Sequence, residues 1–360
     1  MSREPKSASS TSATGPAPEG FYRVAIVGAG TLKGKELSEM LPESSFPATD
    51  IKLLDDDESL GQLEAVGEEV TFVQSVRPEN FEHVDFAFFA SRAEFTRKTW
   101  PMAKRAGAVI IDLSYGLEEL AGARVRSPWM ERELRQPVAP ELEPAPVIAA
   151  HPAAVVLALL LARVQRAGKI RSAVATAFEP ASEHGRAGMD ELHEQTVNLL
   201  SFQEMPRTVF DAQIAFNMVA RYGEKSAPTL EVAERRILDH FKRISGGAVA
   251  ATPSLLLLQA PVFHGHAFSL FVEMDEPHAL GDFTQALAGE HVRVAPLSEE
   301  YPSNVNVAGQ EEILVAVRAD TQRREGFWIW AAADNLRLLA ITAVECAQQM
   351  AAARPRGKLQ

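Results

Sequence analysis

Apolar residues gather in short runs over the first 150 positions, and stretches that favour helix separate several of these runs. We predict strands where the runs are rich in β-branched and apolar residues, at 22–27, 50–54, 84–89, 108–112 and 147–150. Helices are predicted between some of them, at 34–40 and 92–106. Strands that alternate with helices are typical of a parallel sheet whose faces are covered by helices. The first half is therefore expected to be α/β, with a doubly wound parallel sheet.

The pattern changes after position 151. Longer β-like runs appear at 172–178, 254–263, 267–274, 312–317 and 327–332. Helical stretches accompany them at 153–167, 187–200, 228–243 and 334–353. This arrangement favours a second, α+β unit with a mixed or antiparallel sheet.

The composition narrows the class of protein. The chain has 360 residues, which at roughly 150 residues per domain predicts about two domains. Its 36 Lys and Arg against 48 Asp and Glu give a net charge of −12. A chain this acidic is a poor non-specific binder of nucleic acid or of an anionic membrane. We therefore expect neither nucleic acid nor a membrane among its partners.

Three further features bear on the compartment. The single cysteine, Cys346, excludes an intrachain disulfide, which fits a reducing cytosol. The longest apolar run, at 153–164, is shorter than the roughly 20 residues of a membrane span. Residues 1–20 are rich in Ser, Thr, Ala and Pro and are predicted to be a disordered tail instead of a signal peptide. The prediction is a cytoplasmic protein.

A glycine turn joins the first predicted strand to the first helix. Glycines at such a turn let the backbone approach a pyrophosphate, and the helix N-terminus offers free N–H groups to it. The context favours a Rossmann-type dinucleotide site, and the alternative is a tight turn that binds no ligand. The candidate cofactor-binding residues of this turn are Gly28, Gly30, Thr31, Leu32 and Gly34.

The end of the second strand separates NAD from NADP. Carboxylates there bind the ribose diol, whereas a 2′-phosphate requires Arg or Lys. Four acids stand together at 55–58, beginning with Asp55, and they would repel a phosphate dianion. NAD is therefore favoured over NADP if a cofactor binds, and the alternative is a solvated acidic loop.

Several segments together resemble the aspartate-semialdehyde dehydrogenase family, in the family's order and spacing. The resemblance implies a Rossmann domain at 21–150, a dimerisation and substrate domain at 151–331, a C-terminal helix at 332–353 that packs on the first domain, and tails at 1–20 and 354–360. It also implies a homodimer. The segments are VGAGTLKG at 27–34, AGAVIIDLS at 106–114, AGMDELHEQT at 187–196, IAFNMV at 214–219, APVFHGHAFSL at 260–270, VAGQEEI at 307–313 and AADNLR at 332–337.

The family reduces an aspartyl phosphate through a cysteine thioester, with NADPH as hydride donor. Its nucleophilic cysteine lies in an Asn-Pro-Asn-Cys segment, which is matched here by residues 151–154. Ala154 stands at the nucleophile position, and a methyl group cannot form a thioester. No Ser, Thr or Cys occurs within residues 151–156.

Other matched positions also depart from the family. His266 retains the acid/base position and Asn335 a position near the nicotinamide, whereas Gln259 replaces the carboxylate-binding Arg and Glu179 replaces a Gln. The family's substrate-phosphate positions and 2′-phosphate Arg are matched by Leu113, Glu118 and Glu58. A polyanionic substrate needs cations, so these positions predict a pocket that is negatively charged and unsuited to the family substrate.

Three hypotheses follow. The first is a dimeric, NAD-binding paralogue without catalytic activity, which acts by regulation or scaffolding with a small-molecule ligand. The second is an NAD-dependent oxidoreductase with non-covalent chemistry, in which His266 donates a proton to a carbonyl. The third is the family reaction carried out by an unorthodox nucleophile.

Two titratable groupings complete the candidates. His264 and His266 would share one face of a strand, but no third metal ligand is evident, so no metal is predicted. His184, with Glu179 and Glu183, forms either a polar site or a solvated loop.

Overall fold

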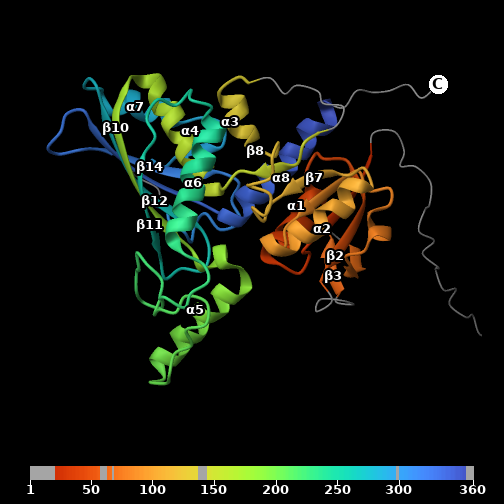
Figure 1. Cartoon of the computed structure of the whole chain (residues 1–360). Coiled ribbons are helices and arrows are strands. Elements are labelled where there is room, and N and C mark those ends of the chain that lie inside the picture. The colour runs from red at the N-terminus through yellow and green to blue at the C-terminus, as the bar shows by residue number, and fades with distance from the viewer. Residues whose placement is uncertain (1–20, 57–62, 67–68, 137–143, 297–299, 354–360) are drawn as a thin grey trace, which may run out of the picture.

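The computed structural model describes residues 21–56, 63–66, 69–136, 144–296 and 300–353. Figure 1 shows two lobes, the first built on a parallel sheet with α1 and α2, and the second built on a mixed sheet with α4 and α6. The α/β fold prediction, with a Rossmann-type sheet followed by a mixed-sheet unit, is confirmed. Glu58 and the rest of the acidic cluster beyond Asp56 lie outside the described residues.

The first sheet has seven strands, and every pair in it is parallel. Its spatial order is β5 (Gln74–Ser75), β2 (Ala48–Asp55), β1 (Tyr22–Val27), β6 (Phe86–Phe89), β7 (Val109–Asp112), β9 (Val147–Ala149) and β8 (Arg124–Arg126). A separate antiparallel hairpin joins β3 (Leu63–Val66) to β4 (Glu69–Phe72). The helices of this lobe are α1 (Leu32–Glu43) and α2 (Ala93–Arg105), whereas the short α3 (Pro128–Glu133) packs against helices of the second lobe and is drawn there in Figure 1.

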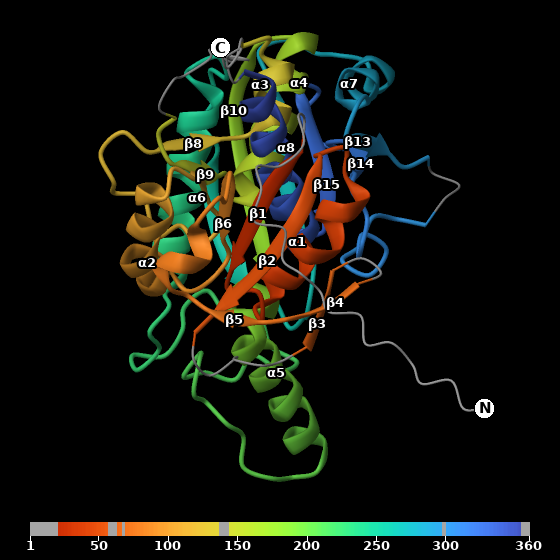
Figure 2. The ribbon, with the colours of Figure 1, turned by 90° about the vertical axis from the view of Figure 1, so that its right-hand side faces the viewer.

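The second sheet has six strands and is mixed. Its order is β11 (Ser254–Gln259), β10 (Ile170–Glu179), β12 (His266–Met274), β15 (Gly326–Ala333), β14 (Ile313–Ala319) and β13 (Val292–Val294). Its helices are α4 (Pro152–Ala167), α5 (Gly185–Leu200), α6 (Leu230–Ser245) and α7 (Leu280–Leu287). Helix α5 projects away from both sheets, as Figures 1 and 2 show.

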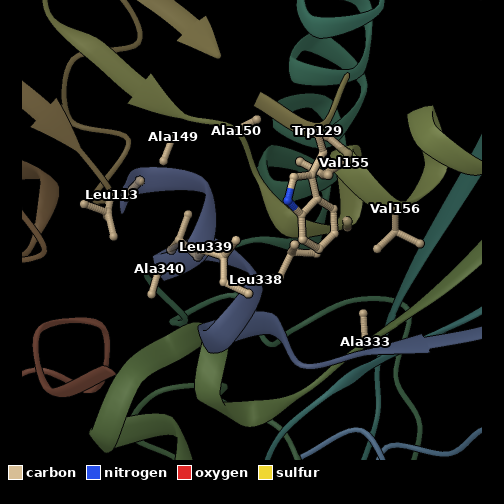
Figure 3. Packing of buried hydrophobic residues seen from close by; sticks show 14 of the residues in the cluster. Leu113, Trp129, Ala149, Ala150, Val155, Val156, Ala333, Leu338, Leu339 and Ala340 are labelled. Carbon is tan, nitrogen blue, oxygen red and sulfur yellow. The ribbon is translucent and has the colours of Figure 1, made fainter. Parts of the chain in front are cut away.

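Helix α8 (Asn335–Ala353) connects the two lobes. It leaves the second sheet after β15 and packs against α1, β7 and β9 of the first lobe. Figure 3 shows Leu338, Leu339 and Ala340 of α8 beside Leu113 and Ala149. These side chains are almost completely buried, so one continuous apolar core fixes the lobes against each other.

The predicted elements differ from the structure mainly at their ends. The run at 254–263 forms a strand only as far as Gln259, and the following residues turn back toward β12. His264 lies in that turn, ahead of β12, so the assumption that it shares a strand face with His266 is wrong. Short or charged elements such as β8, β13 and α3 were not predicted from the sequence. Within the described ranges, no helix combines the length and the apolar character that crossing a bilayer requires.

Candidate functional site

The glycine turn between β1 and α1 is closely packed and is fixed by hydrogen bonds from its backbone N–H groups to side chains. Gly28 has a φ of 90°, and a Cβ there would lie 2.5 Å from the Ser91 nitrogen. Thr31 caps α1, since its Oγ1 accepts a hydrogen bond from the Gly34 N–H at 3.0 Å. The predicted strand, turn and helix are therefore present.

Asp55 contacts this turn directly. Its Oδ2 accepts a hydrogen bond from the Gly30 N–H at 2.8 Å, and the residue is buried at the end of β2. Burial raises the pKa of Asp55, with the two backbone N–H donors acting in the opposite direction. Asp55 thus braces the glycine turn in this structure, and its contact with a ribose remains a prediction.

A cavity of about 480 Å³ opens between the two lobes. It lies at the carboxyl ends of β1, β6, β7 and β9, where parallel sheets of this type bind ligands. Of the predicted site residues, Thr31, Leu32 and Glu179 line it. The others do not: Gly28, Gly30, Gly34, Asp55, Ala154, Gln259, His266 and Asn335. The charged and titratable lining residues are Lys33, Arg92, Tyr115, His151, Glu179, Glu183, His184 and Arg236.

Ala154 lies in the first turn of α4 and has no exposed surface. The preceding His151 caps this helix, because its Nδ1 accepts a hydrogen bond from the Ala153 N–H at 3.2 Å. The His151 N–H in turn donates to Nδ1 of His240 at 2.9 Å. Burial lowers the pKa of His151 well below its usual value, so its imidazole is neutral near pH 7.

Glu183 lies between two buried imidazoles. Its carboxylate oxygens are 3.8 Å from Nε2 of His151 and 3.8 Å from Nε2 of His266. Asn335 donates a hydrogen bond to Glu183 at 2.8 Å. Burial acts to raise the pKa of Glu183, but the two histidines, Lys33 and this hydrogen bond hold it at about 2. Neither ring nitrogen of His266 has a hydrogen-bond partner among the described residues.

Removing the charge of Glu183 tests its electrostatic role. Because the pKa of Glu183 is lowered in the folded state, the stability that it contributes is present above about pH 4.5 and is lost as the pH falls toward about 2. Glu183→Gln is expected to reduce the free energy of unfolding at pH 7 and to flatten its pH dependence between these limits. Urea unfolding at several pH values measures both effects, with Glu39→Gln, an exposed carboxylate on α1, as the control. Parallel pH curves for wild type and Glu183→Gln would contradict the assignment.

A polar network occupies the neighbouring side of the site. The His184 Nε2 lies 3.0 Å from Oε1 of Glu179 and 2.8 Å from the Tyr222 hydroxyl, which donates to Gln259 Oε1 at 2.7 Å. The Gln259 amide nitrogen donates to the carbonyl oxygens of Glu179 and Ala260. The side-chain oxygen and nitrogen of Gln259 are therefore both hydrogen-bonded within the protein. Of the two interpretations of the His184 cluster, the structure supports a polar site over a solvated loop.

The expectation of a negatively charged pocket is wrong. Lys33 and Arg236 both line the cavity, and both lie over the ring of Tyr115, at 4.6 Å and 4.9 Å from its centroid. Glu118 pairs with Arg236 at 2.6 Å. Neither group was predicted as a site residue. Arg236 comes near Lys33 only because α6 packs against the first lobe. Lys33 itself lies within the glycine-turn motif, which could have indicated it. In the described part of the chain, no cluster of three His, Cys, Asp or Glu side chains forms a metal site.

A Rossmann-type lobe that faces a mixed-sheet lobe across a cavity is an architecture found in two-domain dinucleotide-binding proteins. Residues 23–119 match the model of the semialdehyde dehydrogenase NAD binding domain, and residues 161–338 match that of the semialdehyde dehydrogenase dimerisation domain. The chain belongs to the semialdehyde dehydrogenase family. The predicted resemblance is thereby confirmed.

Individual relatives agree with this assignment. A USG-1 protein homolog of Pseudomonas aeruginosa is 34% identical over 87% of this chain and 93% of its own length. The aspartate-semialdehyde dehydrogenase of Rickettsia conorii is 28% identical over 91% of this chain and 97% of its own. A solved structure of a probable aspartate-semialdehyde dehydrogenase from Pseudomonas aeruginosa superposes with a TM-score of 0.80 at 32% identity, covering 91% of this chain and 97% of the other.

Proposed function

We propose that this chain is a dimeric, NAD-binding member of the semialdehyde dehydrogenase family that does not catalyse the family's phosphate-dependent reaction. The observation that carries the proposal is the buried methyl group of Ala154 at the matched nucleophile position, outside the cavity lining. Covalent catalysis on an acyl group requires a nucleophile, and an alkyl side chain supplies none. Cys346 is no substitute, because it is fully buried in α8 and burial raises the pKa of its thiol.

The substrate side of the site supports the same proposal. Gln259 has no charge to offer a substrate carboxylate, and Tyr222 and two backbone carbonyls occupy its amide group. A polyanionic acyl phosphate would therefore lack the charged contact that the family's Arg makes at this position, since such ligands are held by charge-assisted hydrogen bonds.

The cofactor in this proposal is NAD in preference to NADP. Asp55 stands at the end of β2, where a ribose diol is bound in folds of this type, and its carboxylate would repel a 2′-phosphate. The adenosine half would lie over β1 and β2 and the nicotinamide half over β6 and β7, beside the cavity.

Calorimetric titration combined with a turnover assay tests the function. We expect NAD or NADH to bind more tightly than its phosphorylated counterpart, and aspartate semialdehyde with phosphate to give no NADP or NAD reduction. Sustained phosphate-dependent turnover would refute the loss of the family reaction. Absence of binding by all four dinucleotides would refute the NAD-binding part alone.

A second candidate function is favoured by one observation. His266 is buried, Glu183 is 3.8 Å from it, and its ring nitrogens have no hydrogen-bond partner among the described residues. Such a histidine could donate a proton to a carbonyl during non-covalent hydride transfer. Oxidation of NADH by an aldehyde or keto acid, abolished in His266→Ala, would favour this function over the first.

The homodimer in this proposal uses the open face of the mixed sheet. Strands β10 and β11 present Val174 and Leu256, each 50% exposed, on the face where neighbouring strands carry Trp328 and Trp330. Exposed apolar sheet faces of this kind mark protein interfaces. Leu256→Asp is therefore expected to convert a dimer into monomers in sedimentation velocity experiments. Phe72→Asp, at an exposed position on β4, is expected to leave the dimer intact. A monomeric wild type, or a Leu256→Asp variant that remains dimeric, would contradict this interface.

A further inference from the structure

The Lys33 side chain extends from the first turn of α1 into the cavity. Its Nζ donates a hydrogen bond to the Leu113 carbonyl oxygen at 2.9 Å. No Asp or Glu oxygen of the described residues lies within 4.0 Å of this nitrogen, whereas most lysines that are removed from water have such a partner. Leu113 is the neutral residue at a position where the family has a polar one. Lys33 is thus a cavity-lining amine without a paired carboxylate.

A second cation shares the surroundings of Lys33. The guanidinium carbon of Arg236 lies 4.9 Å from the centroid of the Tyr115 ring, and Lys33 Nζ lies 4.6 Å from the same centroid. The pKa of Lys33 is lowered, chiefly by burial, with the Arg236 charge acting in the same direction and Glu183 and Asp112 opposing it. Desolvation and a neighbouring cation are the two conditions that make a lysine amine nucleophilic near neutral pH.

We propose that the Lys33 amine is a reversible covalent anchor for a small carbonyl compound that carries a carboxylate, such as an aldehyde acid or a 2-oxo acid. The amine nitrogen attacks the carbonyl carbon and forms a carbinolamine. The hydroxyl group then leaves with a proton as water, and a C=N bond joins Lys33 to the ligand. Hydrolysis returns the amine and the carbonyl, so the cycle needs no oxidant or reductant.

The remaining cavity residues suit this chemistry. Dehydration of a carbinolamine requires a group that transfers a proton, and His151, His184 and Glu183 all line the same cavity. The Nε of Arg236 donates a hydrogen bond to Glu118. Within the described ranges, its two terminal nitrogens donate none. These nitrogens can bind a carboxylate in the bidentate manner that guanidinium groups favour. A volume of about 480 Å³ accommodates a ligand of this size.

This anchor goes beyond the proposed function, because it requires neither hydride transfer nor a bound dinucleotide. It also differs from cysteine-based catalysis. The nucleophile comes from the glycine turn of the first lobe, and the resulting bond is C=N in place of a thioester. Failure of NAD to bind would leave it intact, and failure of the anchor would leave the NAD-binding proposal intact.

Borohydride trapping tests the anchor. The full-length protein is incubated at pH 7 with glyoxylate, with pyruvate, or with acetaldehyde as a probe without a carboxylate, and sodium borohydride is then added. Peptide mass spectrometry locates the reduced adducts. An ordinary lysine with a pKa near 10.4 is only ~0.04% amine at pH 7. We therefore expect Lys33 to carry on the order of tenfold more adduct than exposed lysines such as Lys98 and Lys169.

Two variants sharpen the outcome. Lys33→Arg keeps the positive charge but has no amine that can form an imine, so its adduct is expected to disappear from this position. Lys98→Arg, on the surface of α2, is expected to leave the Lys33 adduct unchanged. Adduct on Lys33 at or below the level on Lys98 in the wild-type protein overturns the proposal, without reliance on any variant. Equal labelling by acetaldehyde and glyoxylate overturns the role assigned to the carboxylate.

Discussion

Ala154→Cys is expected to show no phosphate-dependent reduction of NADP or NAD by aspartate semialdehyde. The new thiol would lie in the first turn of α4, where the wild-type side chain is completely buried and does not reach the cavity. Burial in apolar surroundings raises the pKa of a thiol, which leaves little of the reactive thiolate near neutral pH. The variant therefore gains a sulfur atom without gaining an activated nucleophile.

The matched substrate-binding positions would also remain without a cation in this variant. Each lost charged contact costs on the order of 2–4 kcal/mol, or roughly 30- to 1000-fold in rate. Gln259 and Glu118 stand at the two positions matched to the family's Arg residues, and losing both contacts would reduce the rate on the order of 10³- to 10⁶-fold. Restoring the thiol alone does not offset a loss of this size.

The measurement has a matched control in the same helix. Ala158→Cys places a thiol one turn further along α4, also fully buried. We expect both variants to react slowly with a thiol reagent and neither to turn over substrate. Turnover by Ala154→Cys that exceeds both the wild type and Ala158→Cys would show that the pocket still recognises the family substrate.

Gly34→Ala is expected to give the largest loss of stability among single substitutions in the glycine turn. A Cβ at Gly34 would lie 2.2 Å from the Gly28 carbonyl oxygen and 2.8 Å from the Ala29 Cα. Both neighbours are backbone atoms, so no side-chain rotation can relieve the contact. The turn must open, which would break the Thr31 cap and the Asp55 contact with Gly30.

We expect this change to lower the free energy of unfolding by about 3 kcal/mol or more, as overpacking of a closely packed site does. At roughly 2–4 °C per kcal/mol for domains of this size, the melting temperature would fall by about 6–12 °C. Dinucleotide binding would weaken with it.

Gly281→Ala is the matched control for this change. Gly281 lies in α7, and a Cβ added there would have no neighbouring heavy atom within 4 Å. Alanine at this position is therefore expected to be neutral or to stabilise the protein by about 0.5–1 kcal/mol. Similar melting temperatures for the two variants would show that the turn is more tolerant than its geometry indicates.

Much of the fold follows from local sequence pattern. The apolar runs at 22–27 and 108–112 form β1 and β7, since short β-branched runs between turns have few alternatives to a buried strand. The glycine turn was also predictable, because only glycine fits where the backbone of Ser91 approaches Gly28 and that of Gly28 approaches Gly34. Charged edge elements such as β8 and β13 were not predictable, since their stability comes from pairing with a neighbouring strand.

The candidate site could be predicted only in part from the local sequence pattern. The sequence indicated Glu179, Gln259 and His266, but it did not indicate that Tyr222 joins Gln259 and His184 into one network. Tyr222 lies in an irregular segment between α5 and α6 that shows no periodic pattern. The unpaired ring nitrogens of His266 were equally hidden, because hydrogen-bond satisfaction depends on groups distant in the sequence, such as Glu183 and His151, that lie beside this ring.

The sequence by itself determined the two-domain α/β architecture, the glycine turn, the absence of a nucleophile at Ala154 and the family to which these features point. These features depend on residues that are close together in the sequence, because side-chain volume and backbone conformational freedom determine local structure over a few positions. Only the tertiary structure decided the charge of the pocket. Lys33 and Arg236 are separated by about two hundred positions in the chain, and the packing of α6 against the first lobe brings both onto the ring of Tyr115. Electrostatic interaction depends on distance in space, so a charge count along the chain could not predict it.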